Sequence, residues 1–285
     1  ISTMCIYNIT TMCIYNCYHT FEKKDMNRII TILILAMCLT SCSDNKIEKK
    51  GFQVSEISED ENGQKIVGLN IDSLKLETRL RNVLLTNNPE HRISPIYKVN
   101  YNKKNEPYTG SNSYHTNWNN NYEDGNNWNN NFMPGFEAVY GYNFVNISHY
   151  NNQTKEENKL FKKQVLIKTL YYPAFTKDTL NFEPVNRKYY MVSVYDEDSN
   201  KDGFINVKDL RKFYHFDIEG KNKRNLIPVN YSVMSSEYDS ANDFMYVFAK
   251  ADKNQNGQME QNEPTDIFWI DLKNPENVGI QYRTE

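Results

Sequence analysis

Apolar and aromatic residues alternate with polar ones along most of the chain after residue 65, which is the pattern of half-buried β-strands. The clearest segments are rich in β-branched and aromatic residues and carry no helical stripe. The expected strands are residues 65–71, 82–86, 93–101, 138–149, 164–172, 189–195, 212–218, 244–249 and 266–272. Short connections join most of them. The pattern therefore predicts a mainly β domain of antiparallel meanders over residues 66–285, with residues 74–80 compatible with a short helix.

Two acidic twelve-residue loops, residues 198–209 and 252–263, interrupt this strand pattern. Each has carboxylate or amide side chains at positions 1, 3 and 5, glycine at position 6 and an acid at position 12. Calcium takes six to eight oxygen ligands, and this spacing winds the oxygens around one ion while the glycine makes the sharp turn and position 7 offers its carbonyl. The predicted ligands are Asp198, Asn200, Asp202, the Phe204 carbonyl and Asp209 for one ion, and Asp252, Asn254, Asn256, the Gln258 carbonyl and Glu263 for the other, with Asp196 and Glu260 as extra candidates.

The two loops are in register, because residues 198 and 252 lie 54 positions apart, as do residues 209 and 263. They resemble EF-hand and dockerin calcium loops, which implies two bound Ca²⁺ ions. Strands rather than helices flank them, so the repeated unit is strand, loop, strand over residues 189–220 and 243–274. Its second strand should bury the same face in each copy. Ligand charge predicts dissociation constants on the order of 10⁻⁵ to 10⁻³ M. The alternative is a pair of Asn/Asp-rich turns without an ion.

The segment 237–248, together with residues 268–272, resembles the blade pattern of Tol-type β-propellers, in which a turn precedes an aromatic strand and the next strand ends in Asp-Leu. The proline and glycine of the usual turn are missing. The resemblance implies a β-propeller-like arrangement, with a β-sandwich as the alternative.

Residues 26–42 have the features of an export signal: a short basic start, an apolar run and the sequence Leu39-Thr40-Ser41-Cys42. This ending resembles the bacterial lipobox and implies lipidation of Cys42. The chain is therefore expected to be an outer-membrane lipoprotein of the cell envelope, similar to lipoproteins of Bacteroidota-type bacteria, on an undetermined membrane face. The alternative is a plain signal peptide with an incidental cysteine. Residues 1–25 are interpreted as a mistranslated upstream extension, and residues 42–65 as a polar tether.

Residues 111–132 are dominated by asparagine and contain Trp118 and Trp128. One interpretation is a poorly ordered insertion. The other is a binding loop, whose tryptophans stack on sugar rings while the amides bond hydroxyl groups.

Composition, charge and the absence of catalytic motifs exclude several classes of function. With 39% hydrophobic and 13% aromatic residues in 285, the chain can bury a full core, and a net charge of −3 does not suggest a nucleic-acid partner. All five cysteines lie within the first 42 residues, so the domain has no disulfide. No zinc motif, nucleophile elbow or phosphate loop occurs. The sequence predicts a non-enzymatic, calcium-binding, lipid-anchored binding or scaffold module for a glycan or an envelope protein; the alternative is a surface polysaccharide hydrolase.

Overall fold

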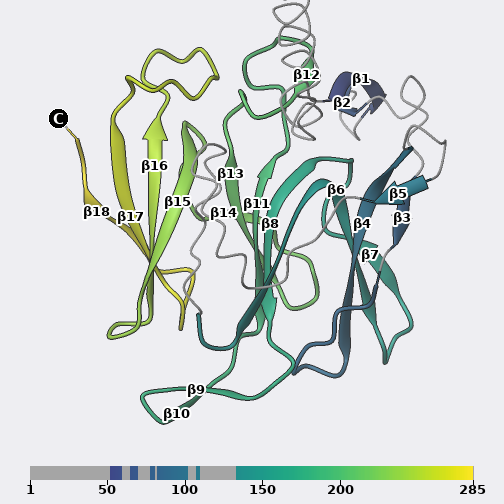
Figure 1. Cartoon of the computed structure of the whole chain (residues 1–285), viewed down its shortest axis with the longest axis vertical. Coiled ribbons are helices and arrows are strands. Elements are labelled where there is room, and N and C mark those ends of the chain that lie inside the picture. The colour runs from purple at the N-terminus through teal and green to yellow at the C-terminus, as the bar shows by residue number, and fades with distance from the viewer. Residues whose placement is uncertain are drawn as a thin grey trace, which may run out of the picture. The chain divides into compact units, whose positions relative to one another are not determined.

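The alternating pattern folds into antiparallel sheets, shown in a computed structural model that describes residues 52–59, 65–69, 78–80, 82–101, 107–109 and 133–284 (Figure 1). The strands are β1 (Phe52–Glu59), β2 (Lys65–Leu69), β3 (Thr78–Leu80), β4 (His91–Tyr101), β5 (Pro107–Thr109), β6 (Phe136–Asn151), β7 (Glu157–Lys159), β8 (Leu166–Pro173), β9 (Asp178–Leu180), β10 (Glu183–Val185), β11 (Tyr189–Tyr195), β12 (Phe204–Ile205), β13 (Lys212–Asp217), β14 (Arg224–Asn225), β15 (Tyr231–Asp239), β16 (Phe244–Ala251), β17 (Thr265–Asp271) and β18 (Val278–Tyr282). The predictions for residues 1–25, 26–41, Cys42, Trp118 and Trp128 lie outside the described residues.

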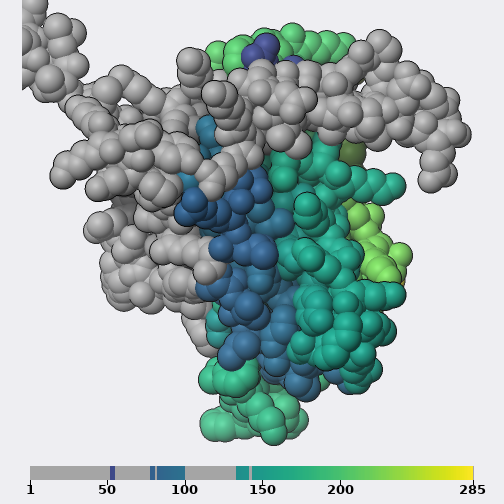
Figure 2. All heavy atoms as spheres, turned by 90° about the vertical axis from the view of Figure 1, so that its right-hand side faces the viewer, coloured from purple at the N-terminus to yellow at the C-terminus, as the bar shows by residue number. Residues whose placement is uncertain are grey.

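Two meanders make up most of the described fold. The larger sheet has nine strands in the order β14-β13-β11-β8-β6-β4-β3, with β5 beside β4 and β7 beside β6, and the smaller has the order β15-β16-β17-β18. Each strand pairs with its neighbours in the antiparallel sense. The prediction of a mainly β fold built from antiparallel meanders is therefore confirmed. Strands β4 (blue) and β6 (teal) lie side by side on the face seen in Figure 2.

The central strands β8 and β11 of the nine-stranded sheet are buried on both faces, which explains why their sequences are continuous apolar runs. In β11, Tyr190 and Val192 point into one buried cluster, whereas Tyr189 and Met191 point into another. The second cluster also contains side chains from the four-stranded sheet, including Val247 and Ile270. The two sheets therefore share one buried layer.

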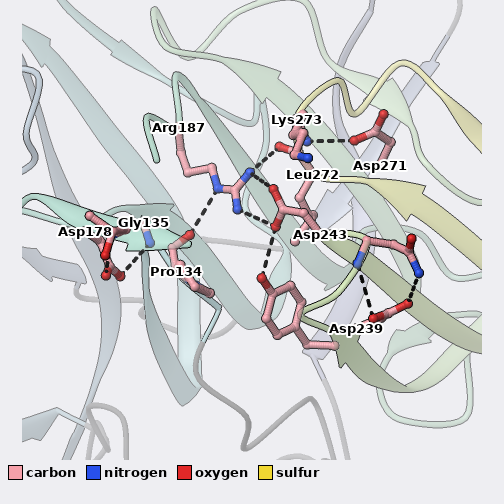
Figure 3. Close-up of polar contacts among 12 residues, drawn as sticks. Pro134, Gly135, Asp178, Arg187, Asp239, Asp243, Asp271, Leu272 and Lys273 are labelled. Atoms are coloured by element: carbon pink, nitrogen blue, oxygen red, sulfur yellow. Dashed lines mark hydrogen bonds and ion pairs between the residues drawn. The ribbon is translucent and has the colours of Figure 1, made fainter. Parts of the chain in front are cut away.

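A buried ion pair links the connection before β11 to the turn between β15 and β16 (Figure 3). The Arg187 guanidinium donates to both carboxylate oxygens of Asp243 at 3.0 and 2.7 Å, and both side chains are only 2% exposed. Arg187 also donates to the carbonyls of Leu272 at 2.6 Å and Pro134 at 3.1 Å. The Tyr238 hydroxyl adds a 3.1 Å bond to Asp243. This charge pair is thus fully hydrogen-bonded across segments far apart in sequence.

The β9–β10 hairpin projects from the base of the larger sheet (Figures 1 and 2). Its turn residues Asn181 and Phe182 both have positive φ angles, 52° and 67°, and Phe182 is 98% exposed. The Asp178 carboxylate accepts a 2.9 Å hydrogen bond from the Gly135 amide, which links the hairpin to the turn just before β6.

Three expectations about the first hundred residues need correction. The segment 42–65, expected to be a tether, contains β1, because Phe52 is an apolar anchor, 1% exposed, that pairs with Ile205 of β12. Residues 82–86 do not form a strand and contribute only the bridge between Leu84 and Ile93. Residues 78–80, placed in a short helix, form strand β3 because they pair with β4. In each case, pairing with a strand elsewhere in the chain determines the secondary structure, and local composition does not encode this pairing.

Acid is expected to destabilise the fold through His215, whose ring packs against Tyr189 at 5.3 Å between centroids. Burial, followed by the charge of Arg224, lowers the pKa of His215 from 6.5 to about 4. The unfolded chain therefore binds more protons between these values, so stability is lost as pH falls from 6.5 toward 4. Replacing His215 with Phe should flatten this dependence by about 1 kcal/mol, after allowing for the ring's partial exposure. Urea unfolding at pH 7 and 4.5 measures it; an unchanged pH dependence would refute this role of His215.

Candidate calcium loops

The first loop connects β11 to β13 through β12 and bonds its own backbone with the predicted ligand side chains. The Asp198 carboxylate accepts hydrogen bonds from the amides of Asp202 at 3.0 Å and Gly203 at 2.8 Å. The Asn200 side-chain oxygen accepts from the Asp202 amide at 2.9 Å, and the Asp202 carboxylate accepts from Phe204 at 3.0 Å. Positions 1, 3 and 5 therefore turn their oxygens inward along the loop.

The second loop, between β16 and β17, repeats these bonds position by position. Asp252 accepts from the amides of Asn256 at 3.1 Å and Gly257 at 3.0 Å. The Asn254 oxygen accepts from Asn256 at 3.0 Å, and the Asn256 oxygen accepts from Gln258 at 2.8 Å. The two predicted loops therefore share one conformation despite their different sequences.

Backbone angles show the same match. Positions 4 and 6 have positive φ in both loops: Lys201 and Gly203 at 60° and 86°, Gln255 and Gly257 at 57° and 71°. Glycine adopts this region at little cost, which explains its presence at position 6.

The acid at position 12 closes each loop by reaching back to positions 2 and 9. Asp209 accepts from the amides of Ser199 at 2.9 Å and Asn206 at 2.8 Å. Glu263 accepts from Lys253 at 3.2 Å and Glu260 at 3.1 Å. The longer glutamate and the shorter aspartate thus reach equivalent backbone groups.

The closing acids place negative charge in buried surroundings. Asp209 is 0% exposed, and its burial raises its pKa to about 6. Backbone hydrogen bonds partly oppose this shift, whereas the nearby Asp198 charge adds to it. Within the described part of the chain, the ion pairs involve none of Asp198, Asp209, Asp252 and Glu263. A bound cation would neutralise the negative charge of these four carboxylates, which form no ion pair with a lysine or arginine side chain of the described residues.

The two extra candidate ligands differ in position. Glu260 accepts bonds from the side-chain amides of Asn254 at 3.2 Å and Asn256 at 2.8 Å, so it supplies a carboxylate next to the neutral residues of the second loop. Asp196 instead accepts from the Tyr214 hydroxyl at 2.8 Å and pairs with Lys223 at 3.5 Å. Glu260 therefore belongs with the second loop, whereas Asp196 is bonded to strand β13 and to Lys223.

The loops also contact each other, which the sequence did not indicate. The Ser199 hydroxyl donates to the Gly257 carbonyl at 2.6 Å, and the Met259 amide donates to the Lys208 carbonyl at 3.3 Å. Strand β1 is hydrogen-bonded to the first loop, where the Val54 amide donates to the Gly203 carbonyl at 3.0 Å. The two loops and β1 therefore form one connected unit.

Acidic, histidine and cysteine side chains do not gather in threes or more around a potential metal position anywhere in the described chain. The oxygen set of each loop consists instead of carboxylates, amides and carbonyls placed along the backbone. Hard oxygen donors of these kinds suit calcium and would hold it through ligands of mixed type.

Sequence reasoning also missed a histidine pair on β4 and β6. His91 Nδ1 lies 3.0 Å from His149 Nε2, and His149 Nδ1 lies 2.9 Å from Asn158 Oδ1. These residues are far apart in sequence and form no motif, so only the strand pairing brings them together. Burial lowers the pKa of His149.

No family model matches the chain, and no curated protein resembles it closely enough to support a relationship. Among solved structures, a chain in "Crystal structure of Nidogen/Laminin Complex" is 9% identical, with 80% of this chain and 91% of that chain covered and a TM-score of 0.21. Such low values support no inference about fold or function. In the described residues, no helix has the length and hydrophobicity of a membrane span.

Proposed function

We propose that the protein binds two structural Ca²⁺ ions and acts as a binding or scaffold module of the cell envelope. The observation that carries the proposal is the position-by-position match between the two loops in hydrogen bonds and backbone angles. The match extends over the full twelve residues, including the closing acid at position 12, which is the span that a calcium loop requires.

The residues that would hold the ions are those the loop pattern assigns. Asp198, Asn200, Asp202, Asp209 and the Phe204 carbonyl serve the first ion, and Asp252, Asn254, Asn256, Glu263 and the Gln258 carbonyl serve the second. Glu260 adds a carboxylate to the second site. When bound, each ion supplies the positive charge that the buried acids lack.

A structural role follows from the expected affinity. Ions present at about a hundred times the dissociation constant stabilise the folded state by about 2.7 kcal/mol per site. Sites of the extracellular class stay mostly filled at millimolar calcium, which favours a constant staple over a sensor. The staple would fix the loops to each other and to β1.

The lipobox-like sequence that ends at Cys42 is the one feature that supports a location in the cell envelope. Of the two expected architectures, the nine-stranded sheet favours a sandwich-like packing with the four-stranded sheet, because each blade of a propeller is a four-stranded sheet.

Calcium should raise the melting temperature, and each closing acid should carry part of the effect. Asp209→Asn and Glu263→Gln keep the side-chain size but remove the charge, so each variant should lose about half of the calcium-dependent rise. Differential scanning calorimetry in calcium and in chelator measures this. Glu183→Gln, an exposed acid on the β9–β10 hairpin, is the matched control.

Magnesium at the same concentration should have a smaller effect, because it demands near-octahedral geometry and keeps its waters. A melting temperature that calcium leaves unchanged, or a rise that both variants retain in full, would refute the proposal.

A further inference from the structure

The four-stranded sheet has an aromatic outer face. Strand alternation sends Met245 and Val247 of β16 and Phe268 of β17 into the buried layer shared with the larger sheet. Their neighbours along the strands point to the opposite side, and all are half-buried. We call these residues the aromatic face: Phe244, Tyr246, Phe248, Ile267 and Trp269.

Strand register makes these side chains one continuous patch. Tyr246 is paired with Trp269, and Phe248 is paired with Ile267. Phe244 stacks on Trp269 with 5.2 Å between ring centroids and 14° between ring planes. Rings on adjacent strands therefore lie next to one another across β16 and β17.

Gly279 of β18 makes room for the indole. It pairs directly with Trp269, and a Cβ atom added there would come within 2.5 Å of the indole ring carbons. Glycine inside a strand is unfavourable and marks a place where another group approaches closely. Here that group is the Trp269 ring, which lies across β18 and is held in place.

Carboxylates line the rim of the aromatic face, and two of them are hydrogen-bonded to turn amides. The Asp239 carboxylate accepts from the Ala241 amide at 2.9 Å, and the Asp271 carboxylate accepts from the Lys273 amide at 2.9 Å. Lys250, further along β16, donates to the carbonyls of Gln261 and Glu263 at 2.7 and 2.8 Å. The backbone of Glu237 is paired with Tyr246, and its exposed carboxylate has no hydrogen bond or ion pair to any described residue.

We infer that the aromatic face binds a neutral polysaccharide, with the chain lying across β16 and β17. Aromatic rings offer flat apolar surfaces to sugar rings, and tyrosine adds a polar tip. The Glu237 carboxylate would accept bonds from sugar hydroxyls. The rim carboxylates keep their negative charge and disfavour anionic polymers. The stacked rings beside them favour a ligand that combines flat apolar faces with hydroxyl groups.

The extent of the aromatic face points to a polymer. Because its rings spread over two adjacent strands, they can contact consecutive sugar units of one chain. The inference rests on the proposed binding role and gives it a ligand class, but it needs no bound calcium.

Native gel electrophoresis in gels that contain galactomannan, xyloglucan or mixed-linkage β-glucan tests the inference on the full chain, with polygalacturonate and oligolysine as charged probes. We expect retardation by at least one neutral polysaccharide. Trp269→Ala and Tyr246→Ala should each weaken it at least tenfold. Phe182→Ala removes an exposed aromatic ring elsewhere and should leave it unchanged.

Melting temperatures in calcium and in chelator, measured on the same samples, show whether each variant is folded and report calcium binding separately. If Trp269→Ala does not fold, the polysaccharide binding of Tyr246→Ala and Glu237→Gln tests the inference in its place. The inference is overturned if none of the neutral polysaccharides retards the protein, or if these variants are retarded as strongly as the unmodified protein. Binding of oligolysine that the variants abolish would assign the face to a basic peptide instead.

Discussion

Replacing Gly257 with alanine is expected to destabilise the protein by about 2–5 kcal/mol, because left-handed strain and a backbone collision add together. Gly257 has φ of +71°, and an added Cβ atom would lie 1.9 Å from the Ser199 carbonyl oxygen of the other loop. The Cβ atom is attached directly to the backbone of Gly257, and the Ser199 atoms that it would meet also belong to the backbone. The collision can therefore be relieved only by separating the two loops. Urea unfolding in calcium-free buffer measures the loss.

Gly203→Ala is the matched control, at the same position of the first loop. It has φ of +86°, but an added Cβ would meet no heavy atom of the structure within 4 Å, its chain neighbours aside. Strain alone should cost about 1–2 kcal/mol. Equal losses for the two variants would show that the contact between the loops contributes nothing to stability.

Arg187→Met is expected to cost about 3–5 kcal/mol, since breaking a buried ion pair leaves an uncompensated charge. The substitution would strand the Asp243 carboxylate, which is 2% exposed, and remove the donors to the Leu272 and Pro134 carbonyls. Chemical denaturation at neutral pH gives the value.

Two further variants identify the cause of that loss. Adding Asp243→Asn removes the stranded charge and should recover part of the stability, and asparagine tolerates the positive φ of 59° at this position. Arg224→Met breaks a surface ion pair between Arg224, whose side chain is 30% exposed, and Glu276, whose side chain is 74% exposed. This substitution should cost about 0–1 kcal/mol. A loss for Arg187→Met no larger than for Arg224→Met would contradict a stabilising role for the buried pair.

Strand positions were predictable where side-chain alternation was strong. The 54-residue step maps Tyr214 and Phe216 onto Phe268 and Ile270, and all four are buried. The step did not reveal that the first pair belongs to one buried cluster and the second to the other. Local periodicity determines which face of a strand is apolar, but the packing of whole sheets determines what covers that face.

The calcium loops were likewise predictable from sequence only in part. Ligand types and spacing within each loop follow from twelve consecutive residues, so the loops could be predicted from sequence. The contacts between Ser199 and Gly257, between Arg187 and Asp243, and between β1 and β12 join residues more than fifty positions apart. No local pattern encodes such contacts, because they depend on how the strands assemble.

Calorimetric titration of calcium into the chelator-stripped protein tests the central claim most directly. The account predicts two sites with dissociation constants on the order of 10⁻⁵ to 10⁻³ M. It also predicts one remaining site in either Asp209→Asn or Glu263→Gln. No binding up to ~10 mM, well above the weak end of that range, would contradict the account and leave the loops as turns that their own hydrogen bonds stabilise.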